Sequence, residues 1–222
     1  MGADAGVEVV PWLLATGVCA ALAIWGKQPS RMLVHWTCKP LTMLLIIAAT
    51  LHFPSSLAPD ARLLLLVALA LSLAGDVALM LASTPLALGL LCFLLAHLAY
   101  LAAFSLAQPW RLTDLVWLAP PLAVVAVATP SLWPHLGRLR PAVVVYIGTL
   151  VLVAWRLLAR FDLRATIGDA AWIYGALGGL LFLTADSLLA RRRLAHRASP
   201  YVLELGAYFL AQWCIVRGTW NI

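Results

Sequence analysis

The chain has 222 residues, of which 64% are hydrophobic and 11% charged, and its mean hydropathy is +0.97. A soluble domain of this length is closer to half apolar and a quarter charged, so the composition excludes an ordinary soluble enzyme. The net charge of +6 comes from basic residues scattered over short connections. Nucleic-acid binding needs basic residues gathered on one face, so we expect no nucleic-acid partner.

Apolar residues come in blocks of about twenty, the length at which a helix crosses roughly 30 Å of hydrocarbon. They predict an all-α polytopic membrane protein, a bundle of eight transmembrane helices that forms a single integral membrane domain over residues 1–222. In the fifth block, Pro120 and Pro121 are expected to produce a kink. The predicted spans are about 9–25, 33–53, 62–82, 85–107, 112–130, 141–159, 168–190 and 199–219.

Eight spans place both termini on one side of the membrane, here called side A, and the opposite side is side B. Side B connections carry eight Lys and Arg residues, against five or six on side A. The positive-inside rule therefore favours side B as cytoplasmic. The acidic start MGADAGVEVV is unlike a signal peptide, so no removable targeting segment is expected. A composition rich in Ala, Leu and Arg suggests a bacterial inner membrane protein.

Polar residues interrupt several of the predicted spans. Asp76 lies in LSLAGDVALM and Asp186 in LFLTADSLLA, two of the most apolar stretches of the chain. The alternating topology places these residues, and others on three further helices, at one level in the half of the membrane nearest side B. The other residues at this level are Lys39, Tyr146, Glu204 and Tyr208.

Charged side chains within a membrane normally face the protein interior or a wet cavity. Aspartate is too short to reach water from this depth, whereas Lys39 could extend to the interface or form a salt bridge between helices. A structural salt bridge also remains open for Glu204. Three carboxylates and one ammonium do not balance as simple pairs. The excess negative charge predicts one protonated carboxyl group, as a general acid requires.

Three other residues are candidate substrate contacts. His97 and Tyr100 are three residues apart and share a helix face, and hydrogen bonds between helices are the alternative role for both. Ser187 follows Asp186, but no histidine at its depth supports a nucleophilic role. The HExxH pattern of zinc hydrolases and the GxSxG pattern of serine hydrolases do not occur. We expect neither a metal site nor an organic cofactor.

Five segments of the chain resemble the YhhN family of membrane proteins, in the family's order. They are CKPLTMLLIIAAT from Cys38, LSLAGDVALML from Leu71, GLLCFLLAHLAYLAAF from Gly89, LLFLTADSLLA from Leu180 and YFLAQWCIVRG from Tyr208. The family includes the animal lysoplasmalogenases. The resemblance therefore implies an eight-helix enzyme that hydrolyses the vinyl ether of lysoplasmalogens. The products would be a fatty aldehyde and glycerophosphoethanolamine or glycerophosphocholine.

The family's motifs also suggest roles for individual residues. The aspartates of its GD and DS motifs match Asp76 and Asp186, and its KP lysine matches Lys39; Ala185 stands where a serine is common. We expect the two aspartates to form an acid–base pair, with the two roles unassigned. Lys39 would hold the lipid phosphate or tune one aspartate.

Tyr146, Glu204 and Tyr208 would complete the polar pocket. The expected partner is a membrane lipid, and the sequence predicts no oligomeric state. A proton-coupled transporter of lipids or small molecules and a non-catalytic scaffold are the alternatives, because both also use charged residues within the membrane.

Overall fold

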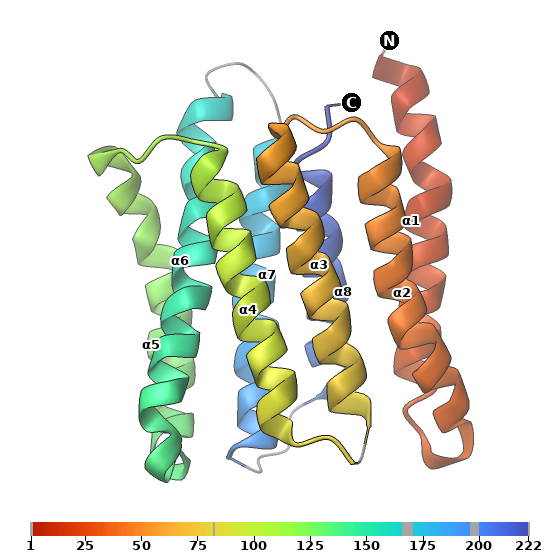
Figure 1. Cartoon of the computed structure of the whole chain (residues 1–222), viewed down its shortest axis with the longest axis vertical. Coiled ribbons are helices and arrows are strands. Elements are labelled where there is room, and N and C mark those ends of the chain that lie inside the picture. The colour runs from red at the N-terminus through yellow and green to blue at the C-terminus, as the bar shows by residue number, and fades with distance from the viewer. Residues whose placement is uncertain (1, 82, 166–170, 196–199, 222) are drawn as a thin grey trace. The chain divides into compact units, whose positions relative to one another are not determined.

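The computed structural model describes residues 2–81, 83–165, 171–195 and 200–221. These residues contain eight α-helices (Figure 1). Their β pairing is limited to one isolated bridge between Ser55 and Trp220, so the all-α fold class is confirmed. The helices are α1 (Gly2–Trp25), α2 (Met32–His52), α3 (Pro59–Met80), α4 (Leu86–Leu106), α5 (Ala119–Leu132), α6 (Arg140–Ala165), α7 (Ala171–Arg193) and α8 (Tyr201–Arg217). Short 3-10 segments are η1 (Pro29–Arg31), η2 (Leu112–Leu118), η3 (Trp133–His135) and η4 (Gly137–Leu139).

Seven helical segments of the described residues are long and apolar enough to cross a membrane. They correspond to the first seven predicted spans, so the polytopic membrane architecture is confirmed. The eighth predicted span corresponds to the helix α8, which has 17 residues. Residue 199 of the eighth predicted span and residues 168–170 of the seventh lie outside the described part of the chain.

The proline pair of the fifth span marks a change of helix type. The 3-10 segment η2 ends at Leu118, and α5 begins at Ala119 with prolines in its first turn. Proline lacks a backbone N–H, but the first N–H groups of a helix have no partner within it. Pro120 and Pro121 therefore start an α-helix, rather than kinking one from within.

The chain divides into two compact units, which are described separately. Unit 1 comprises Met1–Ala99 with Thr219–Ile222, and unit 2 comprises Tyr100–Gly218. The passage from one to the other falls within α4. The single domain expected from the sequence stays a prediction.

In unit 1, α2 packs against α1 and α3. His35 of α2 is buried, and its Nδ1 lies 2.7 Å from the carbonyl oxygen of Ala23 in α1. The C-terminal segment returns to the end of α2, where the rings of Trp220 and Phe53 pack with centroids 4.3 Å apart. The segment after α8 thus belongs to the core of unit 1.

In unit 2, α7 packs between α6 and α8. A glycine allows close approach of α8: a Cβ atom on Gly178 would lie 2.8 Å from the backbone nitrogen of Ile215 and 3.0 Å from the carbonyl oxygen of Ala211. Small residues at helix contacts allow this kind of approach within membranes. The contact lies toward the start of α7 and the end of α8, away from Asp186 and Glu204.

We expect Gly178→Ala to destabilise the protein by about 1–3 kcal/mol, because the new methyl group meets backbone atoms that cannot rotate away. The matched control is Gly148→Ala in α6, where an added Cβ meets nothing within 4 Å. That change should be neutral or stabilising, because alanine favours helix. Thermal unfolding in detergent measures both variants. Equal Tm values for the two variants would show that α7 and α8 are not in close contact.

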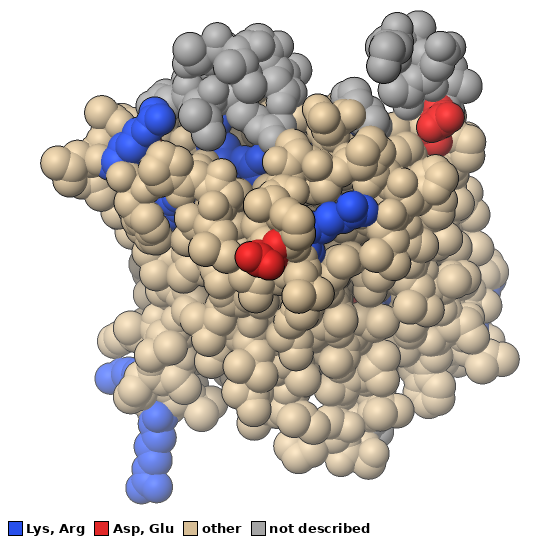
Figure 2. All heavy atoms as spheres, turned by 45° about the horizontal axis from the view of Figure 1, so that its top comes forward, with Lys and Arg blue, Asp and Glu red and all other residues tan. Residues whose placement is uncertain are grey.

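The surface of the protein is predominantly apolar. Figure 2 shows one face on which Lys, Arg, Asp and Glu side chains are few among other residues. Large apolar side chains are exposed on several helices, and examples are Leu33, Leu63 and Val127. Such a surface suits contact with lipid chains rather than with water.

Candidate functional site

Two charged residues of unit 1 form a buried ion pair. Lys39 lies seven residues after the start of α2 at Met32, and Asp76 four residues before the end of α3 at Met80. The Lys39 Nζ and Asp76 Oδ1 atoms are 2.8 Å apart, and the two side chains are 9% and 3% exposed. Lys39 therefore pairs with a neighbouring helix and does not extend to the interface. Close pairing offsets part of the cost of removing both charges from water.

The residue before Asp76 in α3 is a glycine, and its lack of a side chain allows close packing against α4. A Cβ atom on Gly75 would lie 2.8 Å from the ring of Phe93 in α4. The glycine thus allows this aromatic ring to pack directly against α3 beside the aspartate. Both Asp76 and Phe93 are almost fully buried. Because Lys39 and Asp76 are also buried, water screens the attraction between their charges less than it would at the surface.

In unit 2, a tyrosine holds the second aspartate. The hydroxyl of Tyr146 in α6 donates a hydrogen bond of 2.6 Å to Oδ2 of Asp186 in α7. Asp186 is 5% exposed. The length lies within the normal range of an O–H···O hydrogen bond. Two residues expected in one polar pocket, 40 positions apart in sequence, are therefore in direct contact.

Glu204 of α8 pairs with an arginine at the end of α7. Arg192 donates from Nε to one carboxylate oxygen at 2.7 Å and from Nη2 to the other at 2.6 Å. The predicted seventh span ends at residue 190, which places Arg192 in the connection that follows. In the structure, α7 continues to Arg193 and brings Arg192 to α8. The count of three carboxylates against one ammonium was therefore wrong. A second cation balances Glu204, which leaves three carboxylates against two cations at this level.

The other two candidate aromatic residues of unit 2, Tyr100 and Tyr208, are buried. Tyr208 packs against Phe182, with ring centroids 6.0 Å apart. Tyr100 donates a hydrogen bond to the side-chain oxygen of Gln212 in α8. Tyr100 thus has the interhelical hydrogen bond that was the alternative to substrate contact.

His97 and Ser187 are the remaining candidates. His97 of α4 is fully buried and lies in unit 1. The Ser187 hydroxyl donates a 2.8 Å hydrogen bond to the carbonyl oxygen of Leu183 in its own helix. This bond occupies the proton that a nucleophilic serine would give to a base. Across the described residues, no three His, Cys, Asp or Glu side chains come together as a metal site.

Within each unit, the polar residues lie toward the helix ends assigned to side B. In unit 1, they lie near the start of α2 and the end of α3. In unit 2, they lie near the start of α6, the end of α7 and the start of α8. Each unit thus presents one buried aspartate fixed by a polar side chain from a neighbouring helix. Such an arrangement can position a carboxyl group for proton transfer to a substrate.

A further polar cluster of unit 2 was missed in the sequence. The guanidinium of Arg156 in α6 is fully buried, and its Nη1 lies 3.4 Å from Asp114 Oδ2. Its Nη2 donates to the carbonyl oxygen of Gln108 at 2.8 Å, and the ring of Trp110 covers it at 4.3 Å. An arginine inside an apolar run, VLVAWRLLAR, was the available signal. These contacts hold the segment that follows α4 against α6.

Comparisons with known proteins agree with the motifs. The model of the YhhN family matches residues 34–219. The chain is similar to lysoplasmalogenase TMEM86A from Homo sapiens, with 28% identity over 216 residues that cover 95% of this chain and 87% of the human protein. No solved structure matches the chain. The match includes all nine candidate residues, from Lys39 to Tyr208.

Proposed function

Because the chain belongs to the YhhN family, we propose that it is a lysoplasmalogenase-like hydrolase. It would cleave the vinyl ether bond of a lysoplasmalogen to a fatty aldehyde and glycerophosphoethanolamine or glycerophosphocholine. The similar human protein is named a lysoplasmalogenase. One observation carries the chemistry: each unit holds a buried aspartate in contact with a polar partner, Asp76 with Lys39 and Asp186 with Tyr146.

The reaction needs one proton donor and one carboxylate. Protonation of the vinyl carbon farther from the ether oxygen gives an oxocarbenium cation. A water molecule adds to this cation and loses a proton, which yields a hemiacetal. The hemiacetal then collapses to the aldehyde and the free glycerol hydroxyl. Glycoside hydrolysis passes through a similar cation and divides the work between two carboxyl groups in the same way.

The contacts of the two aspartates support a division of roles. The Lys39 ammonium at 2.8 Å favours the carboxylate form of Asp76. Asp76 would therefore stabilise the cation and accept the proton of the attacking water. Asp186 would deliver the proton to carbon, with its carboxyl group oriented by the Tyr146 hydroxyl.

The remaining polar residues would bind and orient the lipid. Lys39 is engaged by Asp76, which favours its tuning role over phosphate binding. The phosphate would instead meet the arginine run at the end of α7, Arg191–Arg193, which is attractive to anions. Glu204 would fix this run through Arg192, while Tyr208, Tyr100, His97 and Ser187 would line the path of the substrate. The reaction would take place near the cytoplasmic leaflet of a bacterial inner membrane.

The decisive comparison is between two lipids that differ only in the bond joining the chain to glycerol, which is a vinyl ether in one and an ester in the other. Purified protein is incubated with a lysoplasmalogen and with the ester lysophospholipid of the same headgroup and chain length, and products are followed by mass spectrometry. We expect fatty aldehyde from the vinyl ether and no fatty acid from the ester. No turnover of the vinyl ether would contradict the proposal and favour a transporter or scaffold.

Removal of the Tyr146 hydroxyl tests the orientation of Asp186. We expect Tyr146→Phe to reduce kcat for aldehyde release by about tenfold, because the carboxyl group loses the hydrogen bond that orients it. The matched control is Tyr174→Phe in α7, which removes a hydroxyl from a partly exposed residue of the same unit. Its kcat should equal that of the wild type. Unchanged kcat in Tyr146→Phe would exclude the orienting role.

A further inference from the structure

The connection between α5 and α6 in unit 2 carries two arginines. Arg138 lies in η4 and Arg140 begins α6, and both side chains are exposed. Leu132 and Leu136, which precede them, are buried in one apolar cluster with Ala195, just after the end of α7. The connection is therefore packed against the end of α7. It brings its two arginines to the end of unit 2 at which α7 finishes with three more.

Positive charge exceeds negative charge at this end of unit 2. Among the residues that the structure describes there, five arginines stand against two carboxylates. Glu204 has both of its oxygens occupied by Arg192, and Asp186 is 5% exposed and accepts the hydrogen bond of Tyr146. The excess positive charge attracts anions. We call these five residues the arginine surface: Arg138, Arg140, Arg191, Arg192 and Arg193.

The spacing between Asp186 and the arginine surface matches the length of the substrate. Arg191 follows Asp186 by five residues on α7, which is about 7–8 Å of helix rise. Arg140 precedes Tyr146 by six residues on α6, which is about 9 Å. In a lysoplasmalogen, seven bonds separate the vinyl carbon that receives the proton from the phosphorus atom, about 8 Å in an extended chain. A lipid with this carbon at Asp186 therefore has its phosphate level with the arginines.

We propose that the arginine surface selects lysoplasmalogens whose headgroup carries no cation, such as phosphoglycerol. The inference rests on the proposed hydrolase function and names the substrate class within it. Arginine binds phosphate well, and the phosphoglycerol headgroup keeps the negative charge of its phosphate. Ethanolamine and choline add a cation that the arginines repel, while Glu204 and Asp186 are already engaged and buried. Arg138 and Arg140 are thus specificity-determining residues.

Comparison of three headgroups tests the selection. Lysoplasmalogens with one alkenyl chain and a phosphoglycerol, phosphoethanolamine or phosphocholine headgroup are given to the purified full chain in micelles of a neutral detergent, and kcat/KM for aldehyde release is measured. We expect the value for the phosphoglycerol lipid to exceed the other two about tenfold, through a lower KM. Equal values for the three lipids would overturn the selection and leave the hydrolase function standing. Turnover of none of them would contradict both.

Variants of the two exposed arginines test their part in the selection. Arg138→Gln and Arg140→Gln should each lower the ratio of kcat/KM between the phosphoglycerol and choline lipids about fivefold, because one charge near the headgroup is lost. Arg140→Lys keeps the charge and should keep the ratio of the wild type. An unchanged ratio in both glutamine variants would overturn the proposal. Loss of the preference in Arg140→Lys would do so as well, since the charge would then not be its cause.

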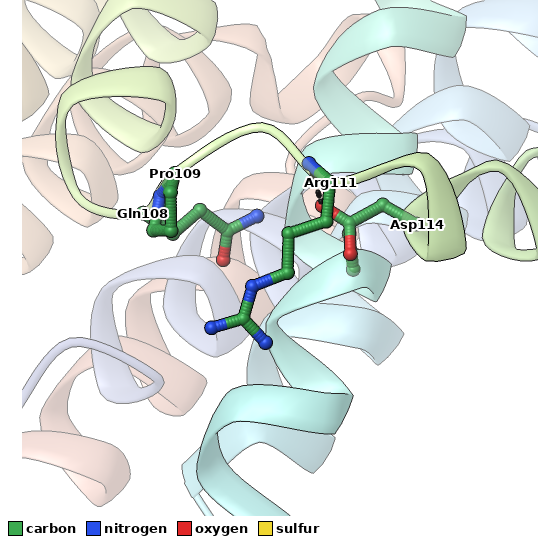
Figure 3. A pocket seen from close by; sticks show the side chains of 5 residues that line it. Gln108, Pro109, Arg111 and Asp114 are labelled. Carbon is green, nitrogen blue, oxygen red and sulfur yellow. Dashed lines mark hydrogen bonds between the residues drawn. The ribbon is translucent and has the colours of Figure 1, made fainter.

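The matched control is Arg111→Gln, which removes an exposed arginine from the opposite end of unit 2. Figure 3 shows Arg111 beside Gln108 and Asp114, and its backbone N–H donates to Asp114 at 3.3 Å, a bond that the substitution retains. The pocket that these residues line has a volume of about 10 Å³, room for about one water molecule and not for a headgroup. Arg111→Gln should therefore keep the ratio of the wild type. A fall equal to that in Arg140→Gln would assign the preference to the overall charge of the protein and overturn the proposal.

Discussion

Asp186→Asn and Asp76→Asn are each expected to lower kcat for aldehyde release by about 10³-fold, within the range found for general acid–base groups. Asparagine keeps the size of the side chain and a carbonyl oxygen for Tyr146 or Lys39 to contact. It can neither deliver a proton to carbon nor balance a cation. The measurement is single-turnover release of fatty aldehyde from a lysoplasmalogen by the purified variants.

The matched control for both changes is Asp60→Asn. Asp60 is exposed in the first turn of α3, and its substitution removes the same charge from the same helix that carries Asp76. Its kcat should stay within about twofold of the wild type, as surface charges far from a reaction contribute little. If either Asp76→Asn or Asp186→Asn retained wild-type aldehyde release, that residue would have no role as acid or base.

Lys39→Met is expected to destabilise the protein by about 3–5 kcal/mol, because it leaves the buried Asp76 without its cation. Lys39→Met/Asp76→Asn removes both charges and should recover most of this loss. Thermal unfolding of the wild type, the two single variants and the double variant completes a double-mutant cycle. Aldehyde release by the double variant should stay as low as in Asp76→Asn.

The same cycle distinguishes a structural from a catalytic ion pair. If the pair served only to hold α2 against α3, the refolded double variant would regain both stability and activity. We expect it to regain stability alone. A Lys39→Met variant with the Tm of the wild type would show that the Lys39–Asp76 ion pair contributes nothing to stability.

The helical spans and the principal residues could be predicted from local features of the sequence. An apolar block of about twenty residues specifies a crossing helix whatever its neighbours are. Asp76 and Asp186 stand out because a short carboxylate in such a block cannot reach water. The family resemblance rests on motifs around the same residues, and it is confirmed by the match over residues 34–219.

The pairing of side chains could not be predicted in the same way. Lys39 and Asp76 belong to different helices, so their contact depends on how α2 and α3 rotate against each other. Arg192 was assigned to a connection, since nothing local shows that α7 continues through three arginines to Arg193. The contact with Glu204 offsets the repulsion among these arginines and stabilises the last turn.

The contacts of Arg156 also could not be predicted from its position in the span. An arginine near the end of a span is typical of a residue that extends to the interface. In the structure, Arg156 instead turns inward to Asp114 and to the carbonyl oxygens of Gln108 and Pro109. Gln108 and Pro109 lie in the connection after α4, whereas Asp114 lies in η2, within the fifth predicted span. Their contact with Arg156 is tertiary and has no local signature.

The central claim is that a carboxyl group of this protein protonates the vinyl carbon of a lipid substrate. The most direct test is turnover of a lysoplasmalogen in D₂O, with immediate reduction of the released aldehyde and mass spectrometry of the alcohol. Protonation by a carboxyl group in exchange with solvent predicts one deuterium on the carbon next to the aldehyde carbon. Release of aldehyde without deuterium at that carbon would contradict the mechanism.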